Sequence, residues 1–220
     1  DRFDVNADKL NVKALNRHEV LTTATGVSVA AGMYGNGSIA GAISVLNLDN
    51  ETIAGVANVD SVNNGMQVLA YQDNEVEVYN NSASLGGSIG GGGIGAGIHV
   101  LKDSSVTNAV LQNANVTHDN NDSDDSIVAK SDTDVKTELS NAVLQISIGA
   151  GIGGVVSVNN VNNIVQTDVV GVNVSGGDEF TAKSENNITT DYAAGVGSGG
   201  LVAVATGVSV NNINSATVTN

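Results

Sequence analysis

The sequence predicts an all-β protein folded as a parallel β-helix (β-solenoid) of about four repeats near 56 residues each. Three observations predict this fold: apolar residues that alternate with polar ones, a glycine-rich segment that recurs between two such runs, and the absence of proline from the 220 residues. Alternation with a period of two is the pattern of a β-strand. Because proline is excluded from central strands, nearly the whole chain is free to form strands, and we expect almost no helix.

The repeating unit is plainest between Leu144 and Val161. Two alternating apolar runs are separated there by four glycines, which predicts a strand, a glycine corner and a second strand. The same design recurs in segments 27–46, 85–101 and 193–210. The chain is therefore predicted to be a repeat protein.

Three anchor positions set the period. An alanine in a short strand recurs at intervals of 56, 59 and 53 residues, a valine after the glycine corner at 55, 58 and 52, and an Asn-Val pair at 57 and 58. The anchors are Ala14, Ala70, Ala129 and Ala182; Val45, Val100, Val158 and Val210; and Asn58-Val59, Asn115-Val116 and Asn173-Val174. Periods of this size are typical of solenoids. We place the repeats roughly at 8–63, 64–122, 123–176 and 177–220, within one segment that spans 1–220.

The short distance across the glycine corner restricts how one repeat winds. Only ten residues lead from Ile148 to Val158, too few to travel around a coil. We therefore predict one broad, flattened turn per repeat, in which each strand pairs in parallel with its counterpart one repeat later, about 4.8 Å away. An antiparallel hairpin about the corner is the alternative. The coil should be right-handed, as parallel crossovers are by rule.

The alternation also predicts which side chains face outward. Ile43 and Val45 flank Ser44, so one face of this strand should be apolar and the other solvated. His99 occupies the place that serine holds in the other repeats, and we therefore expect it to face outward.

Asparagine recurs just after the valine anchor, at Asn47, Asn159-Asn160 and Asn211-Asn212. Stacked amide ladders, in which each side chain bonds to its own copy one repeat away, are the expected reason.

Composition excludes several classes of function. The net charge is −15, from eight Lys and Arg against 23 Asp and Glu, which argues against nucleic-acid binding because phosphates require clustered cations. No cysteine is present, so the chain has neither a disulfide framework nor a thiolate zinc site. The chain begins within the pattern and without a signal peptide, and we expect it to be a fragment of a longer protein.

The most polar stretch, 118–125, carries Asp119, Asp122, Asp124 and Asp125. Clustered carboxylates suit Ca²⁺, but the EF-hand pattern fails, since Lys130 stands where the bidentate glutamate should be. We favour a solvated surface loop, with weak Ca²⁺ binding as the alternative, and we predict no other metal or cofactor.

Polysaccharide-active enzymes also use parallel β-helices, with paired carboxylates in a groove and aromatic platforms for sugar rings. Glu75, Glu77, Glu138 and Asp191 are expected to be scattered, and the tyrosines do not recur as a row. The three histidines occupy different places in the repeat. We therefore predict no catalytic residues and no enzymatic activity.

Several segments resemble one known family. A VVSVNN run follows a GAGIGG corner at 149–160, and TAKS and NITT segments follow at 181–184 and 187–190. This style of repeat resembles large secreted adhesins of Gram-negative anaerobes, of the leukotoxin type and similar to filamentous haemagglutinin. The resemblance covers essentially all of the chain and is one of repeat style rather than of a diagnostic motif.

This resemblance implies a shaft segment that is exported by two-partner or autotransporter secretion through an outer-membrane partner. It implies a location outside the cell or on the bacterial outer surface, and a role in host-cell attachment and virulence. Two hypotheses stay open: a passive shaft, or a module whose lateral surface binds a host receptor or glycan. Strand edges exposed at the terminal repeats would also allow end-to-end self-association.

Overall fold

The computed structural model describes residues 9–35, 37–63, 65–89, 91–117, 126–175 and 179–220. These residues form nine β-strands and no helix. The strands are β1 (Leu10–Tyr34), β2 (Ser38–Asn63), β3 (Met66–Ile89), β4 (Gly93–Thr117), β5 (Ser126–Ser147), β6 (Ala150–Val170), β7 (Asn173–Ser175), β8 (Glu179–Gly199) and β9 (Val202–Thr219). The prediction of an all-β chain is therefore confirmed for the described residues.

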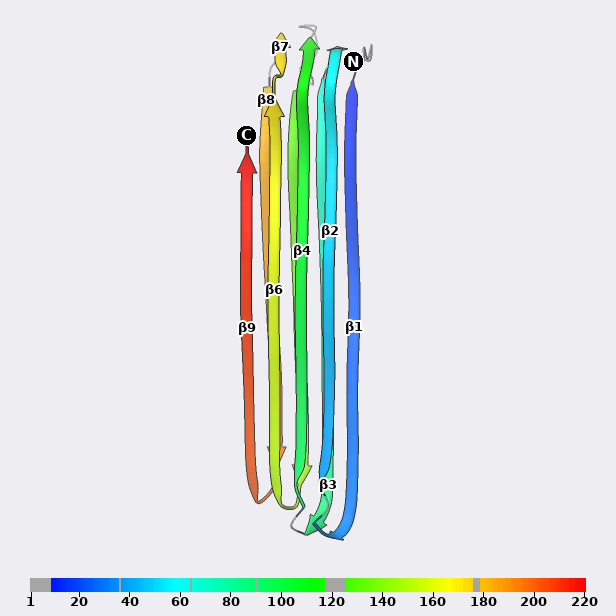
Figure 1. The fold of residues 1–220 in the computed structure, drawn as a ribbon, viewed down its shortest axis with the longest axis vertical. Coiled ribbons are helices and arrows are strands. Elements are labelled where there is room, and N and C mark those ends of the chain that lie inside the picture. Colours follow the sequence, from blue (N-terminus) through cyan, green and yellow to red (C-terminus); the bar gives the residue numbers. More distant parts are fainter. Residues whose placement is uncertain (1–8, 36, 64, 90, 118–125, 176–178) are drawn as a thin grey trace.

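The strands form two parallel sheets (Figure 1). Sheet A has the strand order β2-β4-β6-β9, with the short β7 beside the end of β4, and sheet B has the order β1-β3-β5-β8. Consecutive long strands run in opposite directions and belong to different sheets, so the two runs that flank each glycine corner lie in opposite layers. The antiparallel-hairpin alternative is wrong for the described strands, because every pairing among them is parallel.

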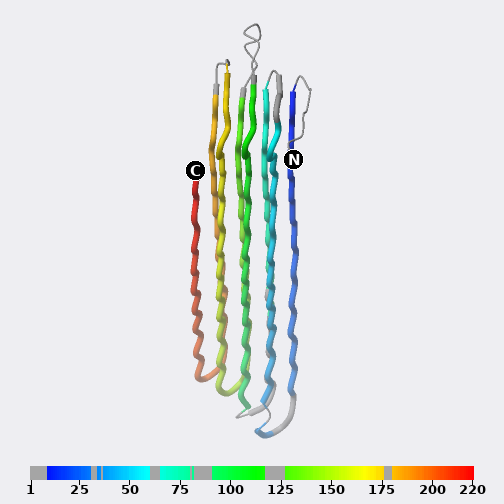
Figure 2. The backbone as a smooth tube through the Cα atoms, turned by 45° about the horizontal axis from the view of Figure 1, so that its top comes forward, coloured from blue at the N-terminus to red at the C-terminus, as the bar shows by residue number. Residues whose placement is uncertain are grey.

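Strands pair with their counterparts one repeat later, as predicted, and β1 and β9 lie at opposite sides of the stack (Figure 2). The alanine anchors and the valine anchors each form one column, Ala14–Ala70–Ala129–Ala182 and Val45–Val100–Val158–Val210. Like residues thus sit over one another through the whole stack.

The predicted pairing of the Asn-Val anchor is confirmed for one of its two steps and wrong for the other. Asn115 and Val116 pair with Asn173 and Val174, but Val59 lies opposite Ala114 rather than Val116. The reason is a bulge: β2 has one more residue than β4 between two matched pairs, so the register shifts after Val59.

A column of left-handed residues lies next to this bulge. Asn58, Asn113 and Gly171 have φ angles of 58°, 48° and 66°, a region that asparagine and glycine tolerate better than other residues. Asn113 Nδ2 donates a hydrogen bond of 3.1 Å to Asn58 Oδ1. A Cβ atom at Gly171 would stand 2.6 Å from Asn113 Oδ1. A side chain at the third position of the column would therefore be strained and would have to displace the Asn113 amide.

Replacing Gly171 with alanine is expected to lower the free energy of unfolding by about 1–2 kcal/mol, from the left-handed backbone and the contact with Asn113. The measurement is urea denaturation followed by circular dichroism. Gly207→Ala is the matched control, because a Cβ at Gly207 meets nothing within 4 Å. Equal losses in the two variants would contradict the role given to the left-handed column.

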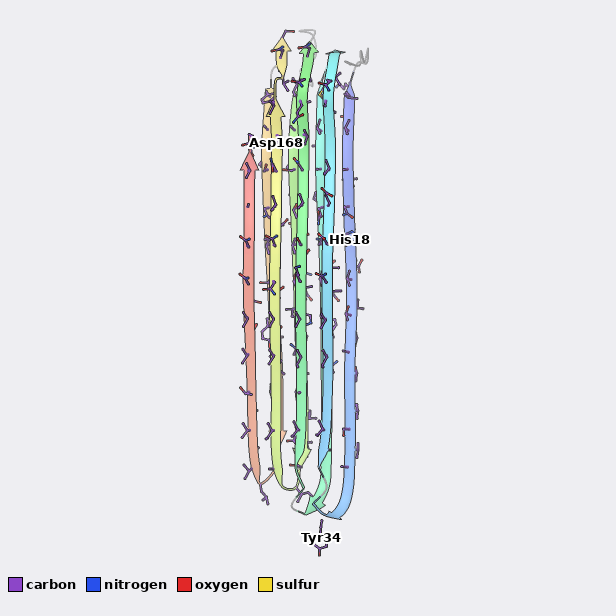
Figure 3. The ribbon with its side chains drawn as sticks, viewed as in Figure 1. His18, Tyr34 and Asp168 are labelled. Carbon is purple, nitrogen blue, oxygen red and sulfur yellow. The ribbon has the colours of Figure 1, made fainter. Side chains whose placement is uncertain are left out.

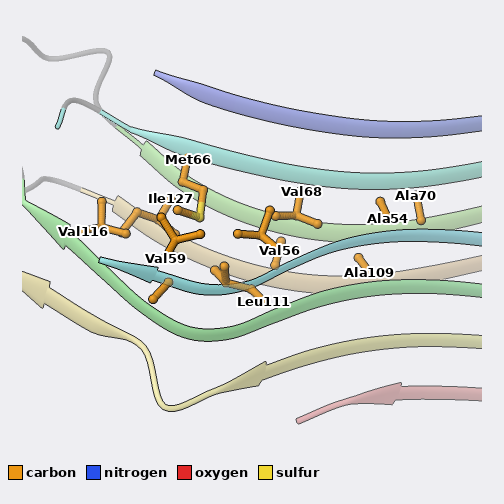
Figure 4. Packing of buried hydrophobic residues seen from close by; sticks show 12 residues of the cluster. Ala54, Val56, Val59, Met66, Val68, Ala70, Ala109, Leu111, Val116 and Ile127 are labelled. Atoms are coloured by element: carbon orange, nitrogen blue, oxygen red, sulfur yellow. The ribbon is translucent and has the colours of Figure 1, made fainter. Parts of the chain in front are cut away.

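The large apolar side chains are buried at the end of the molecule opposite the glycine corners (Figure 4). Met66, Val68, Leu111, Val116 and Ile127 are each at most 1% exposed. The core cluster comprises Ala54, Val56, Val59, Met66, Val68, Ala70, Ala109, Leu111, Ala114, Val116, Ile127 and Ala129. The residues of this cluster point between the sheets, as alternation predicts.

In the half near the glycine corners the prediction of which face points outward is wrong. Ile43 and Val45 are 67% and 70% exposed, Ser44 is 5% exposed, and His99 is 1% exposed rather than facing outward. The physical reason is the small space left in front of sheet A at this end. A Cβ at Gly95 would lie 2.8 Å from Val143 Cγ1, because buried side chains of sheet B, Val143 and Gln145 among them, occupy the space in front of the glycines of sheet A. Glycine therefore points inward at these positions of sheet A, and Ile43 and Val45 lie outside.

Candidate functional site

The predicted Ca²⁺ ligands, Asp119, Asp122, Asp124 and Asp125, lie outside the described residues. Within the part of the chain that the structure describes, no three histidines and carboxylates come together in a way that could hold a metal ion. A search of the same residues finds no helix suited to crossing a membrane.

The carboxylates predicted to be scattered are in fact aligned. Glu77, Glu138 and Asp191 form one column across β3, β5 and β8, and Glu75 lies opposite Lys136. Their alignment could have been predicted from the sequence, because the members of the column are 61 and 53 residues apart, about one repeat each. Glu138 and Asp191 also line a hollow of about 350 Å³ together with Tyr79 and Tyr192.

One lysine, Lys136, lies between two of these carboxylates on the outer face of sheet B. Lys136 Nζ lies 2.8 Å from Glu138 Oε1 and 3.1 Å from Glu75 Oε1. Glu138 and then Glu75 raise the pKa of Lys136 above its ordinary value. The Tyr79 hydroxyl donates a 3.4 Å hydrogen bond to Glu77 Oε2, and the charge of Glu77 raises the pKa of this tyrosine. Within the column, Glu138 is thus paired with a lysine and Glu77 with a tyrosine hydroxyl.

A second network on the same face has Lys130 at its centre. Its Nζ atom lies 3.0 Å from Asp132 Oδ2 and 2.6 Å from Glu185 Oε2, and Lys183 also pairs with Glu185. Hydrogen bonds from Lys130 and then Lys183 lower the pKa of Glu185 to about 2. Pairs this exposed stabilise a fold only slightly, but they neutralise carboxylates that stacking brings into adjacent strands.

The middle of the molecule has a polar interior that the sequence pattern did not predict. Thr133 Oγ1 of β5 donates a 2.6 Å hydrogen bond to Thr107 Oγ1 of β4, which donates in turn to Gln72 Oε1 of β3 at 3.1 Å. These bonds connect sheet A with sheet B. The described part of the interior thus changes from apolar, through hydrogen-bonded, to glycine-rich along the strands.

Two ionisable groups lie in this interior. Burial lowers the pKa of His99 to about 4. Burial raises the pKa of Asp103, although Ser105 donates a 2.9 Å hydrogen bond to Asp103 Oδ1. Asn74 Nδ2 donates to the oxygen of Ser105 at 3.0 Å. Both groups are at most 1% exposed, so solvent-borne substrates do not reach them.

The outer face of sheet A near the glycine corners is an extended apolar surface. We call it the apolar patch and define it by three columns of β-branched residues: Ile39, Ile94, Ile152 and Val204; Ile43, Ile98, Val156 and Val208; and Val45, Val100, Val158 and Val210. A column of smaller residues, Gly41, Ala96, Gly154 and Thr206, runs between the first two. The surface therefore has ridges separated by a furrow.

The apolar patch belongs to an end of the molecule that carries no Asp, Glu, Lys or Arg. Such residues are absent from segments 20–48, 78–101, 139–167 and 192–220 of the sequence. Tyr34, the last residue of β1, projects from the tip of this end (Figure 3) and is 82% exposed. The charges are therefore confined to the other half of the strands.

The outer face of sheet B is also apolar at this end. Leu144 and Ile146 of β5 are 50% and 47% exposed, and Ile148, just after β5, is 54% exposed. A groove of about 500 Å³ crosses this face, and Thr25, Asn81, Ala142 and Gly195 contribute to its lining from four adjacent strands.

Two kinds of surface are thus candidates for function: the paired charges on sheet B and the apolar faces near the glycine corners. Predicting the apolar faces from the sequence would have required knowing that the glycines of sheet A point into the interior at this end. Comparison with known proteins adds no assignment: no protein-family model, curated protein or solved structure matches the chain.

Proposed function

We propose that the chain is a structural shaft segment of a secreted or surface-displayed bacterial filamentous adhesin that takes part in host-cell attachment. In this proposal the two sheets are the walls of a flattened, right-handed β-solenoid with one turn per repeat. The single observation that carries the proposal is the stacking of like residues, such as the valine anchors, in columns through all the long strands of a sheet. Such columns suit a molecule that lengthens by adding repeats.

The ends of the stack support this interpretation. β1 and β2 at one end, and β8 and β9 at the other, each have one edge without a neighbouring strand among those described. All residues of β9 are exposed. Another repeat, or a second copy joined end to end, would continue the sheets there through parallel pairing. Export and a place outside the cell rest on the resemblance of the repeats to secreted adhesins.

A second function is favoured by a specific observation. The largest exposed apolar face of a monomer is often a site of interaction, and the apolar patch is a face of this kind, with Ile43 and Val45 among its exposed residues. The lateral surface could therefore contact a host receptor or glycan directly rather than only space a binding tip from the cell surface.

Incubating the fluorescently labelled chain with host epithelial cells tests between these functions. A passive shaft predicts binding that rises linearly with concentration and is not displaced by unlabelled chain. Saturable, displaceable binding would contradict the passive shaft and support the lateral module. The same chain unfolded in urea and diluted immediately before use is the control for adhesion of unfolded protein.

A further inference from the structure

We propose that the apolar patch packs against the apolar patch of a second copy of this chain. The contact is lateral, face to face, and is separate from the end-to-end association of strand edges considered above. It goes beyond the proposed function, since a shaft can serve as a spacer whether or not it bundles.

The centre of the apolar patch is complementary in shape to itself. Along β2, Ile39 and Ile43 project from the outer face on either side of Gly41, and the same order is repeated in the strands paired with β2. When two such faces meet with their strands antiparallel, the ridge that begins with Ile43 can lie in the furrow that begins with Gly41 of the other copy. The reverse contact then forms at the same time, as a two-fold symmetric interface requires.

Charge selects this orientation. The chain carries a net charge of −15, and its charged residues lie in the half of the strands away from the apolar patch. When the two-fold axis runs along the stacking direction, only the uncharged ends of the two copies overlap. The two acidic halves then point in opposite directions. The parallel arrangement would place the acidic halves side by side, where like charges repel.

A lipid bilayer suits this surface less well than a second copy. Backbone polar groups must be paired within hydrocarbon, so open sheet edges do not occur there. Among the described strands, β1, β2, β8 and β9 each have such an open edge. Packing between two faces buries the β-branched side chains and leaves the edges in water.

The area of the apolar patch determines how strongly two copies of the chain are expected to dimerise. Seven residues along each of four strands cover about 450 Å² on each copy, or about 900 Å² in total. Stable interfaces bury roughly 1,200–2,000 Å², and each further repeat would add about 200 Å². We therefore expect weak dimerisation of this chain and tighter dimerisation of chains with two or more additional repeats.

Sedimentation velocity of the whole chain, from about 10 µM to about 1 mM, tests the proposal. The expected result is a concentration-dependent dimer whose association constant falls at least about tenfold in Ile43→Glu and in Val156→Glu. Ile53→Glu is the matched control, because Ile53 lies on the outer face of the same strand, is 52% exposed and is outside the apolar patch. The Ile53→Glu variant gains the same negative charge as the other two variants, but it should dimerise like the unmodified chain. Far-UV circular dichroism establishes that each variant is folded.

Four results would overturn the proposal. The chain could stay monomeric throughout the range. Association could be equal in all variants, which would indicate end-to-end pairing of edges. It could be lost in Leu144→Glu and kept in Ile43→Glu, which would assign the contact to sheet B. Finally, the chain could bind phosphatidylcholine vesicles through Ile43 without dimerising, which would make lipid the occupant.

Discussion

Replacing Leu111 with alanine is expected to lower the free energy of unfolding by about 2–5 kcal/mol. Leu111 is fully buried, lies in the apolar core, and stands between Val56 and Val169 of the neighbouring strands. Hydrogen-bonded ladders fix the spacing of these strands, so the walls cannot move in to fill the cavity. Urea denaturation followed by circular dichroism measures the loss.

Leu144→Ala is the control for this prediction. It makes the same chemical change in a paired strand, β5, but the side chain is 50% exposed, and its loss should cost less than about 1 kcal/mol. A similar cost in both variants would show that strand pairing alone, rather than packing between the sheets, holds the molecule together.

Acid is expected to destabilise the fold through His99. Its pKa is about 4 in the folded chain against an ordinary value of 6.5, so between these values the unfolded chain binds a proton that the folded chain does not. The contribution is complete above pH 6.5 and is lost as the pH falls to about 4, by about 3 kcal/mol in total. Denaturation curves from about pH 7 to about pH 4 follow this loss.

The variant His99→Ser isolates the effect, because serine stands at both neighbouring positions of the column, Ser44 and Ser157. Its stability should change less over the same pH range, whatever its stability at neutral pH. Asp103 acts in the opposite direction, since burial raises its pKa, but it is present in both chains and cancels in the difference. Parallel pH profiles for the two chains would contradict the burial of His99.

The pairing of the strands followed from residue spacing. Anchors such as Ala14 and Ala70 recur at the repeat period and lie directly opposite each other. Among the anchors, spacing failed where β2 has an extra residue after Val59. A second register shift lies between Ala31 and Tyr34 of β1. Residue spacing alone does not reveal such irregularities.

The expected amide ladder formed at other positions. Asn47 lies opposite Lys102, which interrupts the predicted column. Amide bonds between adjacent strands occur instead where Asn173 Nδ2 donates to Asn115 Oδ1 at 3.0 Å and Asn214 Nδ2 donates to Asn162 Oδ1 at 3.2 Å. Asparagine side chains therefore do bond between neighbouring strands, as expected. Which asparagines face each other could be stated only once the register of every strand was known.

The candidate surfaces were less predictable than the pairing. The column of Glu77, Glu138 and Asp191 could have been found by applying the repeat period to acidic residues. The apolar patch could not, because alternation shows that Ile43 and Ser44 point to opposite faces without showing which face is inside.

By itself, the sequence determined the strands, their parallel pairing and most of their register, because these depend on local alternation and on a period that the backbone ladder enforces. Only the tertiary structure decided which face of each strand is buried. That choice depends on which side chains of the facing sheet fill the interior, and these change from the apolar core to the glycine corners. Near the corners, Val143 and Gln145 of sheet B occupy the space in front of the sheet A glycines, Ile43 and Val45 lie outside, and His99 is enclosed.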